Sequence, residues 1–247
     1  MIDLLSIFRR GIQPHGDHGS TADESTPLVT ADGWLTGVQR FPTRRTQALA
    51  TPSGRVEGIV WHWTATAGGG RSMTRRAMAL PSPGQHVGSW HLLIERDGTI
   101  LQSAPLTVGT WHAGGQTAKK FSRSTEGEWW PDPAGRCSAN AWACGVELVC
   151  VGEVRSIGRE WQGWPFGRDG KRGPLVPDEE VDAVDGMHYQ IYTPAQIRSA
   201  RTVVAAVREY CGELPARALS WGHRDLDPDR KSDPGPIWSR ILPLVLE

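Results

Sequence analysis

The stretch EGIVWHWTAT, residues 57–66, is the starting point for predicting the fold of the chain. β-Branched and aromatic residues dominate it and glycines follow it, which predicts a β-strand. Alternation places Val60, His62 and Thr64 on one face and Ile59, Trp61 and Trp63 on the other. His62 therefore lies near a strand end, where side chains open onto a cleft. Taken alone, a histidine in this position is most often a hydrogen-bonded structural residue.

Three further segments extend this strand into an α/β pattern. WHLLIERDGTILQSAPL (90–106) predicts a hairpin around Asp97-Gly98, and ACGVELVCV (143–151) predicts another strand. TPAQIRSARTVVAAVREYCG (193–212) predicts a helix with Thr193 as N-cap, a capping box to Gln196 and an apolar stripe at three- and four-residue steps. Together they predict a single α/β domain with a central mixed β-sheet flanked by helices.

Length and charge exclude several classes of protein. The chain has 247 residues, with 27 basic and 27 acidic side chains, so it lacks the basic excess of a nucleic-acid binder. No run approaches the roughly 18 apolar residues of a membrane span, and we expect no stable membrane insertion. The start, MIDLLSIFRRGIQ, lacks the apolar stretch and cleavage site of a secretory signal. Twelve tryptophans favour a cleft or interface, although many could be core.

The predicted domain organisation has two parts. Residues 1–50 form an N-terminal extension, partly flexible because HGDHGSTADESTP (15–27) is polar and rich in turn formers. Its His15 and His18 are expected to be solvated. Residues 51–247 form the main domain, with a polar, glycine-rich insertion near 152–192 that we expect to lie over the surface. The four cysteines fit no CxxC metal spacing, and we expect mostly buried thiols.

Glu147 is the one carboxylate in the apolar strand 143–151. Alternation separates it from Cys144, Val146, Leu148 and Cys150, which form a core face. A carboxylate in this position is costly if buried without partners. It therefore either faces a wet pocket or pairs with a cation, where a perturbed pKa would suit acid/base chemistry, or it lies on the exposed face of an edge strand.

The segment GHRDLDPDRKSDPGP, residues 222–236, crowds charges among three prolines. Stretches of this composition are often solvated turns. The alternative is that the prolines hold His223 and Asp233 so that both bind one metal ion.

Taken together, VWHWTAT, WHLLIERDGTILQ, TWHAGG, CGVELV, YTPAQI and GHRDLDPDRKSDPGP resemble the zinc-dependent N-acetylmuramoyl-L-alanine amidases, which include phage endolysins and are related to peptidoglycan recognition proteins. The resemblance covers roughly residues 56–242, interrupted by the polar insertion. It implies the fold of those proteins and a Zn²⁺ ion bound by His62, His223 and Asp233. Such an ion, with an open position, activates water and polarises an amide carbonyl.

The same resemblance assigns the remaining site residues. It implies that Glu147 is the general base and that Lys231 stabilises the oxyanion. His112 is expected to line the substrate groove, and we place Trp63 and Thr64 with it as substrate-binding residues. His91 and His112 are also rival metal ligands, and we interpret His91 as a structural residue or as a group that supports a ligand.

The predicted function is hydrolysis of the amide bond between N-acetylmuramic acid and L-alanine in bacterial peptidoglycan or muropeptides, by a monomer. A compact amidase without a signal peptide resembles a phage endolysin, which leaves the cytoplasm after holin release and acts at the cell wall. An enzyme that recycles wall fragments or an exported effector is also compatible. The competing classes are a non-catalytic peptidoglycan recognition module and an anchoring part of a phage or secretion device.

Overall fold

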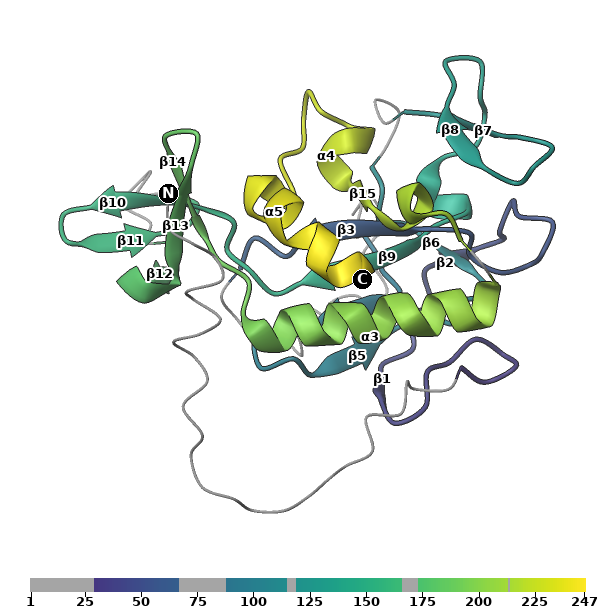
Figure 1. The fold of residues 1–247 in the computed structure, drawn as a ribbon, viewed down its shortest axis with the longest axis horizontal. Coiled ribbons are helices and arrows are strands. Elements are labelled where there is room, and N and C mark those ends of the chain that lie inside the picture. The colour runs from purple at the N-terminus through teal and green to yellow at the C-terminus, as the bar shows by residue number, and fades with distance from the viewer. Residues whose placement is uncertain (1–28, 67–87, 115–118, 166–172, 213) are drawn as a thin grey trace.

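The strand that contains His62 lies inside a six-stranded mixed sheet at the centre of the computed structural model (Figure 1). The structure describes residues 29–66, 88–114, 119–165, 173–212 and 214–247. In spatial order the sheet contains β1 (Gln39–Arg40), β5 (Ile100–Gln102), β4 (Leu92–Ile94), β9 (Cys144–Leu148), β3 (Ile59–Trp63) and β15 (Trp221–Gly222). The β4–β5 hairpin is antiparallel and the other neighbouring strands are parallel, which confirms the predicted mixed sheet.

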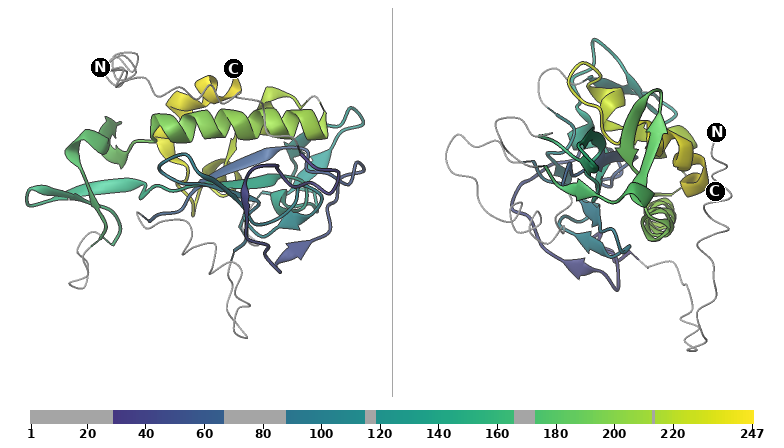
Figure 2. Two further views of the ribbon diagram at one scale, coloured as in Figure 1. Left: turned by 90° about the horizontal axis from the view of Figure 1, so that it is seen from below. Right: turned by 90° about the vertical axis from the view of Figure 1, so that its left-hand side faces the viewer.

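Two helices cover one face of this sheet, as the left view in Figure 2 shows. They are α3 (Pro194–Cys211) and α5 (Gly235–Leu246). Helix α3 begins as predicted, because Thr193 and Gln196 form a reciprocal capping box. The apolar sides of both helices pack on the core face of β3, β4 and β9, and Trp61 contacts Trp238 of α5 with ring centroids 4.7 Å apart.

The opposite face of the sheet carries a smaller core and the candidate site. Val60 of β3 packs there with Phe121 and Trp142. The elements on this side are β2 (Thr46–Gln47), β6 (Gly109–Thr110), β7 (Phe121–Arg123), β8 (Trp129–Pro131) and the 3₁₀ turn η1 (Ala139–Ala141). Trp129 of the β7–β8 hairpin stacks on Trp142 at 5.2 Å, and Glu57 accepts hydrogen bonds from Arg123 and Trp129. These contacts fix the hairpin to the domain.

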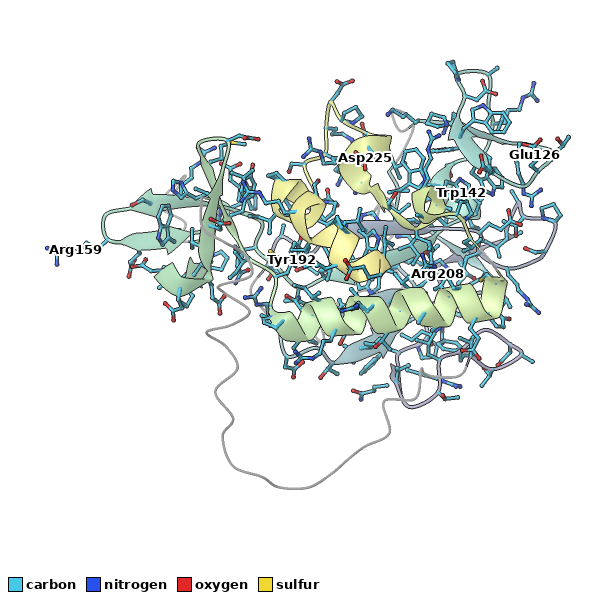
Figure 3. The ribbon with its side chains drawn as sticks, in the orientation of Figure 1. Glu126, Trp142, Arg159, Tyr192, Arg208 and Asp225 are labelled. Carbon is cyan, nitrogen blue, oxygen red and sulfur yellow. The ribbon has the colours of Figure 1, made fainter. Side chains whose placement is uncertain are left out.

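The polar insertion is folded, which the sequence analysis did not predict. Its described residues form a five-stranded antiparallel sheet at the left of Figure 1, in the order β12 (Leu175–Val176), β11 (Glu160–Gln162), β10 (Glu153–Ile157), β14 (Met187–Gln190) and β13 (Val181–Val184). The turn η3 (Asp178–Glu180) precedes β13. Val151, Val154 and Val176 supply its small core. Arg159 marks the outer tip of the β10–β11 hairpin (Figure 3).

Part of the segment before residue 50 belongs to the folded core. Strand β1 pairs with β5, and Leu35 is fully buried among the core residues. His15 and His18 lie outside the described residues. All four cysteines are free; Cys144 and Cys150 are buried and Cys137 and Cys211 are half-buried. None of the described helices is long and apolar enough to cross a membrane.

Candidate metal centre

A cavity of about 310 Å³ opens where β3 and β9 end, on the sheet face that the helices leave uncovered. It is lined by His62, Trp63, Thr64, Ala65, Gly88, Ser89, Trp90, Trp111, His112, Glu147, His223, Lys231 and Asp233. Every residue that the sequence analysis assigned to the site is in this set. The sequence analysis did not assign Trp90 and Trp111 to the site. Their positions directly before His91 and His112 in the sequence could have indicated that they line the same cavity.

Three of these side chains meet in a tight triangle. The Nδ1 atoms of His62 and His223 are 3.0 Å apart, and Asp233 Oδ2 lies 3.1 Å from the first and 3.0 Å from the second. All three residues are buried. Two ring nitrogens and a carboxylate oxygen at this separation repel one another unless protons or a metal ion lie between them.

The triangle fits a zinc ion. A tetrahedral ion with bonds of about 2.0–2.1 Å separates its ligand atoms by about 3.3 Å, close to the distances observed here. Two imidazoles and one carboxylate are a ligand set that zinc uses in catalytic sites. His62, His223 and Asp233 are therefore the residues that could hold the metal.

Each ligand comes from a different structural context. His62 is the fourth residue of β3, and His223 is the first residue of the short helix α4 (His223–Leu226), which follows the turn η4 (Ala216–Leu219) and β15. Strand β15 pairs in parallel with β3, so His223, which directly follows β15, lies beside His62. The Asp233 carbonyl accepts a 2.8 Å hydrogen bond from the Arg224 amide, which folds the intervening loop back on α4.

The hydroxyl of Tyr192 supports this loop from the helical side. It donates a 2.8 Å hydrogen bond to the Pro234 carbonyl, and its ring contacts Trp238 at 5.4 Å. Figure 3 labels Tyr192 beside α3 and α5. The residue after Asp233 is therefore tied to the main core.

The surroundings of the triangle favour a neutral His62 and an ionised Asp233. Burial lowers the pKa of His62 to about 4, so its imidazole is neutral near pH 7. Burial alone would raise the pKa of Asp233, but its close polar contacts with His223 and His62 outweigh burial, and the pKa is lowered. Neutral imidazoles and an ionised carboxylate are the forms that bind a divalent metal ion.

Glu147 lies beside His62 on the neighbouring strand. The two residues are register partners in the parallel β3–β9 pair, so their side chains leave the same face of the sheet. Burial and the charge of Asp233 raise the pKa of Glu147 well above its usual value, and Lys231 opposes this shift. A carboxyl group with a raised pKa beside a metal site suits proton transfer near neutral pH.

Lys231 enters the cavity from the loop between α4 and Asp233. Its amide donates a 2.8 Å hydrogen bond to the Asp227 carbonyl, and the buried Asp227 carboxylate holds the Arg230 side chain at 2.7 Å. The local turn thus places an ammonium group in the same cavity as the ligand triangle.

His112 lines the cavity but also touches a ligand directly. Its Nδ1 atom lies 3.1 Å from Nε2 of His62, and its Nε2 atom lies 3.2 Å from the Ala143 carbonyl oxygen. Its ring packs on Gly145, where a Cβ atom would lie 2.5 Å from His112 Cγ. The sequence analysis did not predict the contact between the two histidines, which are 50 residues apart in the chain.

His91 is structural, in agreement with its interpretation from sequence. It is fully buried and lies outside the set of cavity-lining residues. Its Nε2 atom bonds the Val108 carbonyl at 2.8 Å, while Nδ1 accepts from the Gly145 amide at 3.0 Å. The carbonyl requires a donor and the amide requires an acceptor, so both ring nitrogens are occupied.

Trp63 forms one wall of the cavity and is clamped between two glycines. Its ring lies against Gly152 and Gly235, which have φ of +77° and +80° and leave no room for a Cβ atom. The ring also contacts Tyr189 of β14 at 6.2 Å. Trp63 therefore connects β3, the insertion sheet and the loop that follows Asp233.

A mixed sheet with a buried His-His-Asp triangle beside a carboxylate and a lysine is an arrangement that could hold a metal ion and catalyse hydrolysis. The chain matches the N-acetylmuramoyl-L-alanine amidase family (Amidase_2) over residues 52–236 and belongs to that family.

Individual relatives agree with this assignment. The chain is 27% identical over 159 residues to the 1,6-anhydro-N-acetylmuramyl-L-alanine amidase AmpD of Escherichia coli K12, covering 64% of this chain and 58% of that protein. It is 28% identical over 160 residues to the AmpD of Salmonella typhimurium LT2, covering 64% and 57%. The chain thus spans somewhat over half the length of the curated relatives it matches. A crystal structure of a selenomethionine AmpD derivative has the same fold, with a TM-score of 0.53 and 23% identity over 88% of this chain and 98% of that one.

Proposed function

We propose that this protein is a zinc-dependent amidase that hydrolyses the bond between the lactyl group of N-acetylmuramic acid and L-alanine. The observation that carries the proposal is the triangle of His62, His223 and Asp233 in a cavity that Glu147 and Lys231 also line. Membership of the amidase family supports the same reaction.

Zinc would supply a Lewis acid that polarises the amide carbonyl and makes water acidic enough to attack it. His62, His223 and Asp233 would hold the ion, and the remaining cavity leaves room for a substrate carbonyl beside them. Two neutral ligands and one anionic ligand preserve a net positive charge at the centre, as this chemistry requires.

Glu147 would move the protons of the reaction. As general base it accepts a proton from the attacking water, and as general acid it delivers a proton to the departing L-alanine amine. The environment that raises its pKa favours the first step, because the carboxylate is then a stronger base than an ordinary glutamate.

Lys231 would stabilise the negative charge that develops on the carbonyl oxygen. Lys231 and Glu147 line the same cavity, Lys231 from the loop between α4 and Asp233 and Glu147 from β9. A fixed positive charge in a partly water-excluded site is worth more than it is in bulk water.

The walls of the cavity suit a muramyl peptide. Trp63 is the last residue of β3 and Thr64 follows it, and Trp111 lies at the rim with 48% of its surface exposed. Exposed tryptophan rings stack on the apolar faces of sugars, and the hydroxyl of Thr64 can bond a peptide group. We propose that Trp63, Thr64 and His112 contact the substrate.

Two substrate sources are compatible with this chemistry. The curated relatives are named for 1,6-anhydro-N-acetylmuramyl-L-alanine, which favours soluble muropeptides as the substrate. The expected role as a phage endolysin that acts on the intact wall after holin release is the alternative proposal, supported by the open rim at Trp111. A recognition module or anchoring part would not need Glu147 and Lys231 beside a complete ligand triangle, so we place the enzyme first.

Mass spectrometry of reaction products tests the proposal. Purified sacculi and soluble anhydromuropeptides would each be incubated with the protein, with and without a zinc chelator. Free stem peptides that begin with L-alanine, formed only without chelator, are expected. Release from anhydromuropeptides alone would favour the recycling substrate, whereas release from sacculi would favour the endolysin role. Intact substrates in every sample would refute the amidase and favour a binding module.

A further inference from the structure

The two ring nitrogens of His62 have different partners. Nδ1 belongs to the ligand triangle, while Nε2 contacts Nδ1 of His112 at 3.1 Å. We propose that His112 is a positioning residue that fixes the tautomer of His62, so that the Nδ1 lone pair of His62 faces the metal. This inference rests on the proposed metal centre and adds a function for His112 besides substrate contact.

The location of the protons follows from a backbone carbonyl. The Ala143 oxygen can only accept a hydrogen bond, so the Nε2 atom of His112, 3.2 Å away, carries the proton. A neutral His112 then has an acceptor at Nδ1, and His62 must donate to it through Nε2–H. In the metal-free protein His223 Nδ1–H, 3.0 Å from both Asp233 Oδ2 and His62 Nδ1, can donate to both of them. His62 then keeps a lone pair on Nδ1, the form that a metal ion requires.

His112 is held on three sides, so it can impose this arrangement. The side-chain oxygen of Asn140 accepts from the amides of His112 and Ala113 at 2.8 and 2.6 Å. Gly145 supports the ring from below, since any larger residue there would strike it. The Gly145 amide is itself fixed by its hydrogen bond to His91. A rigid partner selects one tautomer more effectively than a mobile side chain or bulk water.

The second histidine ligand lacks such support. The Nε2 atom of His223 is buried, and within the described residues it has no hydrogen-bond partner. Of the two histidines, therefore, only His62 has a described protein group at the ring nitrogen that lies outside the triangle. The metal affinity of the site should depend on His112 more than on any other residue that does not bind the metal itself.

Substitutions at residue 112 separate positioning from packing. In His112→Ala the acceptor for His62 is lost. In His112→Asn the side-chain oxygen takes the place of Nδ1 and restores an acceptor, although the ring is absent. His188→Ala is the matched control, because it removes a histidine from β14 of the insertion sheet, where the ring stacks on Trp161.

The measurements are the zinc dissociation constant, by competition with a chromophoric chelator, and the tautomer of His62 in metal-free protein, by ¹⁵N–¹H correlation of the imidazole nitrogens. We expect His112→Ala to weaken zinc binding about 10- to 100-fold and to lose the pure Nε2–H tautomer. His112→Asn should recover most of the affinity, and His188→Ala should match the wild type. Thermal unfolding of each variant shows whether the fold is retained.

Unchanged zinc affinity in a folded His112→Ala variant would overturn the inference. So would a folded His112→Asn variant that binds zinc as weakly as His112→Ala, because a lost acceptor would then not be the cause. Since the readout is metal affinity, a wild type that binds zinc but cleaves no substrate would refute only the proposed function. A wild type that binds no zinc would refute the metal centre and this inference together.

Discussion

The strand half of the site, His62 and Glu147, lies on β3 and β9, whereas the loop half lies between β15 and α5 and contains His223, Lys231 and Asp233. Ladder hydrogen bonds on both sides fix the strand half, and His112 and His91 support it in turn. The loop half depends on a few hydrogen bonds, among them Arg224 to the Asp233 carbonyl and Tyr192 to the Pro234 carbonyl. The strand half is thus preformed by the fold, and we expect the loop half to gain more order from the metal.

The largest effect is expected from the loop half. Asp233→Ala removes the only anionic ligand of the triangle, so zinc binding and amidase activity should both fall below detection. Metal content and product release measure this. Asp229→Ala, an exposed aspartate in the same loop, is the control and should behave as wild type. Full activity in Asp233→Ala would remove the metal site from the mechanism.

The strand half should separate chemistry from metal binding. Glu147→Gln keeps the size of the side chain but cannot take a proton, so kcat should fall about 10²- to 10⁴-fold. Zinc affinity should change little, because Glu147 is outside the ligand triangle. Glu126→Gln is the matched control, because Glu126 is an exposed residue between β7 and β8 (Figure 3). A parallel loss of zinc in Glu147→Gln would assign this carboxylate to the metal instead.

Acid should weaken the support beneath the strand half. Burial lowers the pKa of His91 from its usual 6.5 to about 4, so folding favours the neutral ring. The neutral ring contributes fully to stability above pH 6.5. As the pH falls from 6.5 towards 4, this contribution is lost and the free energy of unfolding decreases by about 3 kcal/mol. Denaturant unfolding between pH 7 and 4 measures this slope. In His91→Gln the slope of the unfolding free energy against pH should be smaller, by the amount that corresponds to one proton taken up on unfolding. An equal slope in both proteins would contradict a buried, neutral His91.

The smallest effect comes from the floor beneath His112. Gly145→Ala places a Cβ atom 2.5 Å from His112 Cγ, so the ring must shift and its contact with His62 is disturbed. We expect about tenfold weaker zinc binding and a stability loss of about 1–3 kcal/mol.

Gly158→Ala is the control for this stability loss. Its φ of +68° disfavours alanine, but a Cβ atom there meets no neighbour in the described structure. It should therefore lower stability without changing zinc affinity. If both variants bound zinc like the wild type, the packing of His112 on Gly145 would have no bearing on the metal.

The sequence predicted the elements whose signals are local. Strand β3, the β4–β5 hairpin and α3 carry their own alternation, turn residues and capping box. The resemblance supplied the ligands and Glu147, and the structure brings all of them into one cavity. The insertion sheet was missed because strands such as β11 and β12 are only three and two residues long, too short to show an alternating pattern. The contact between His62 and His112 was missed because it depends on long-range packing.

The pairing of His62 with Glu147 across β3 and β9 has a practical consequence for handling this protein. A slip of one residue between these strands would turn one of the two side chains towards the helix-covered face. A misregistered or partly refolded preparation could then keep its secondary structure and still lack turnover. Specific activity per mole of protein would thus report the fraction of molecules with correct strand pairing, which makes it a sensitive measure of sample quality.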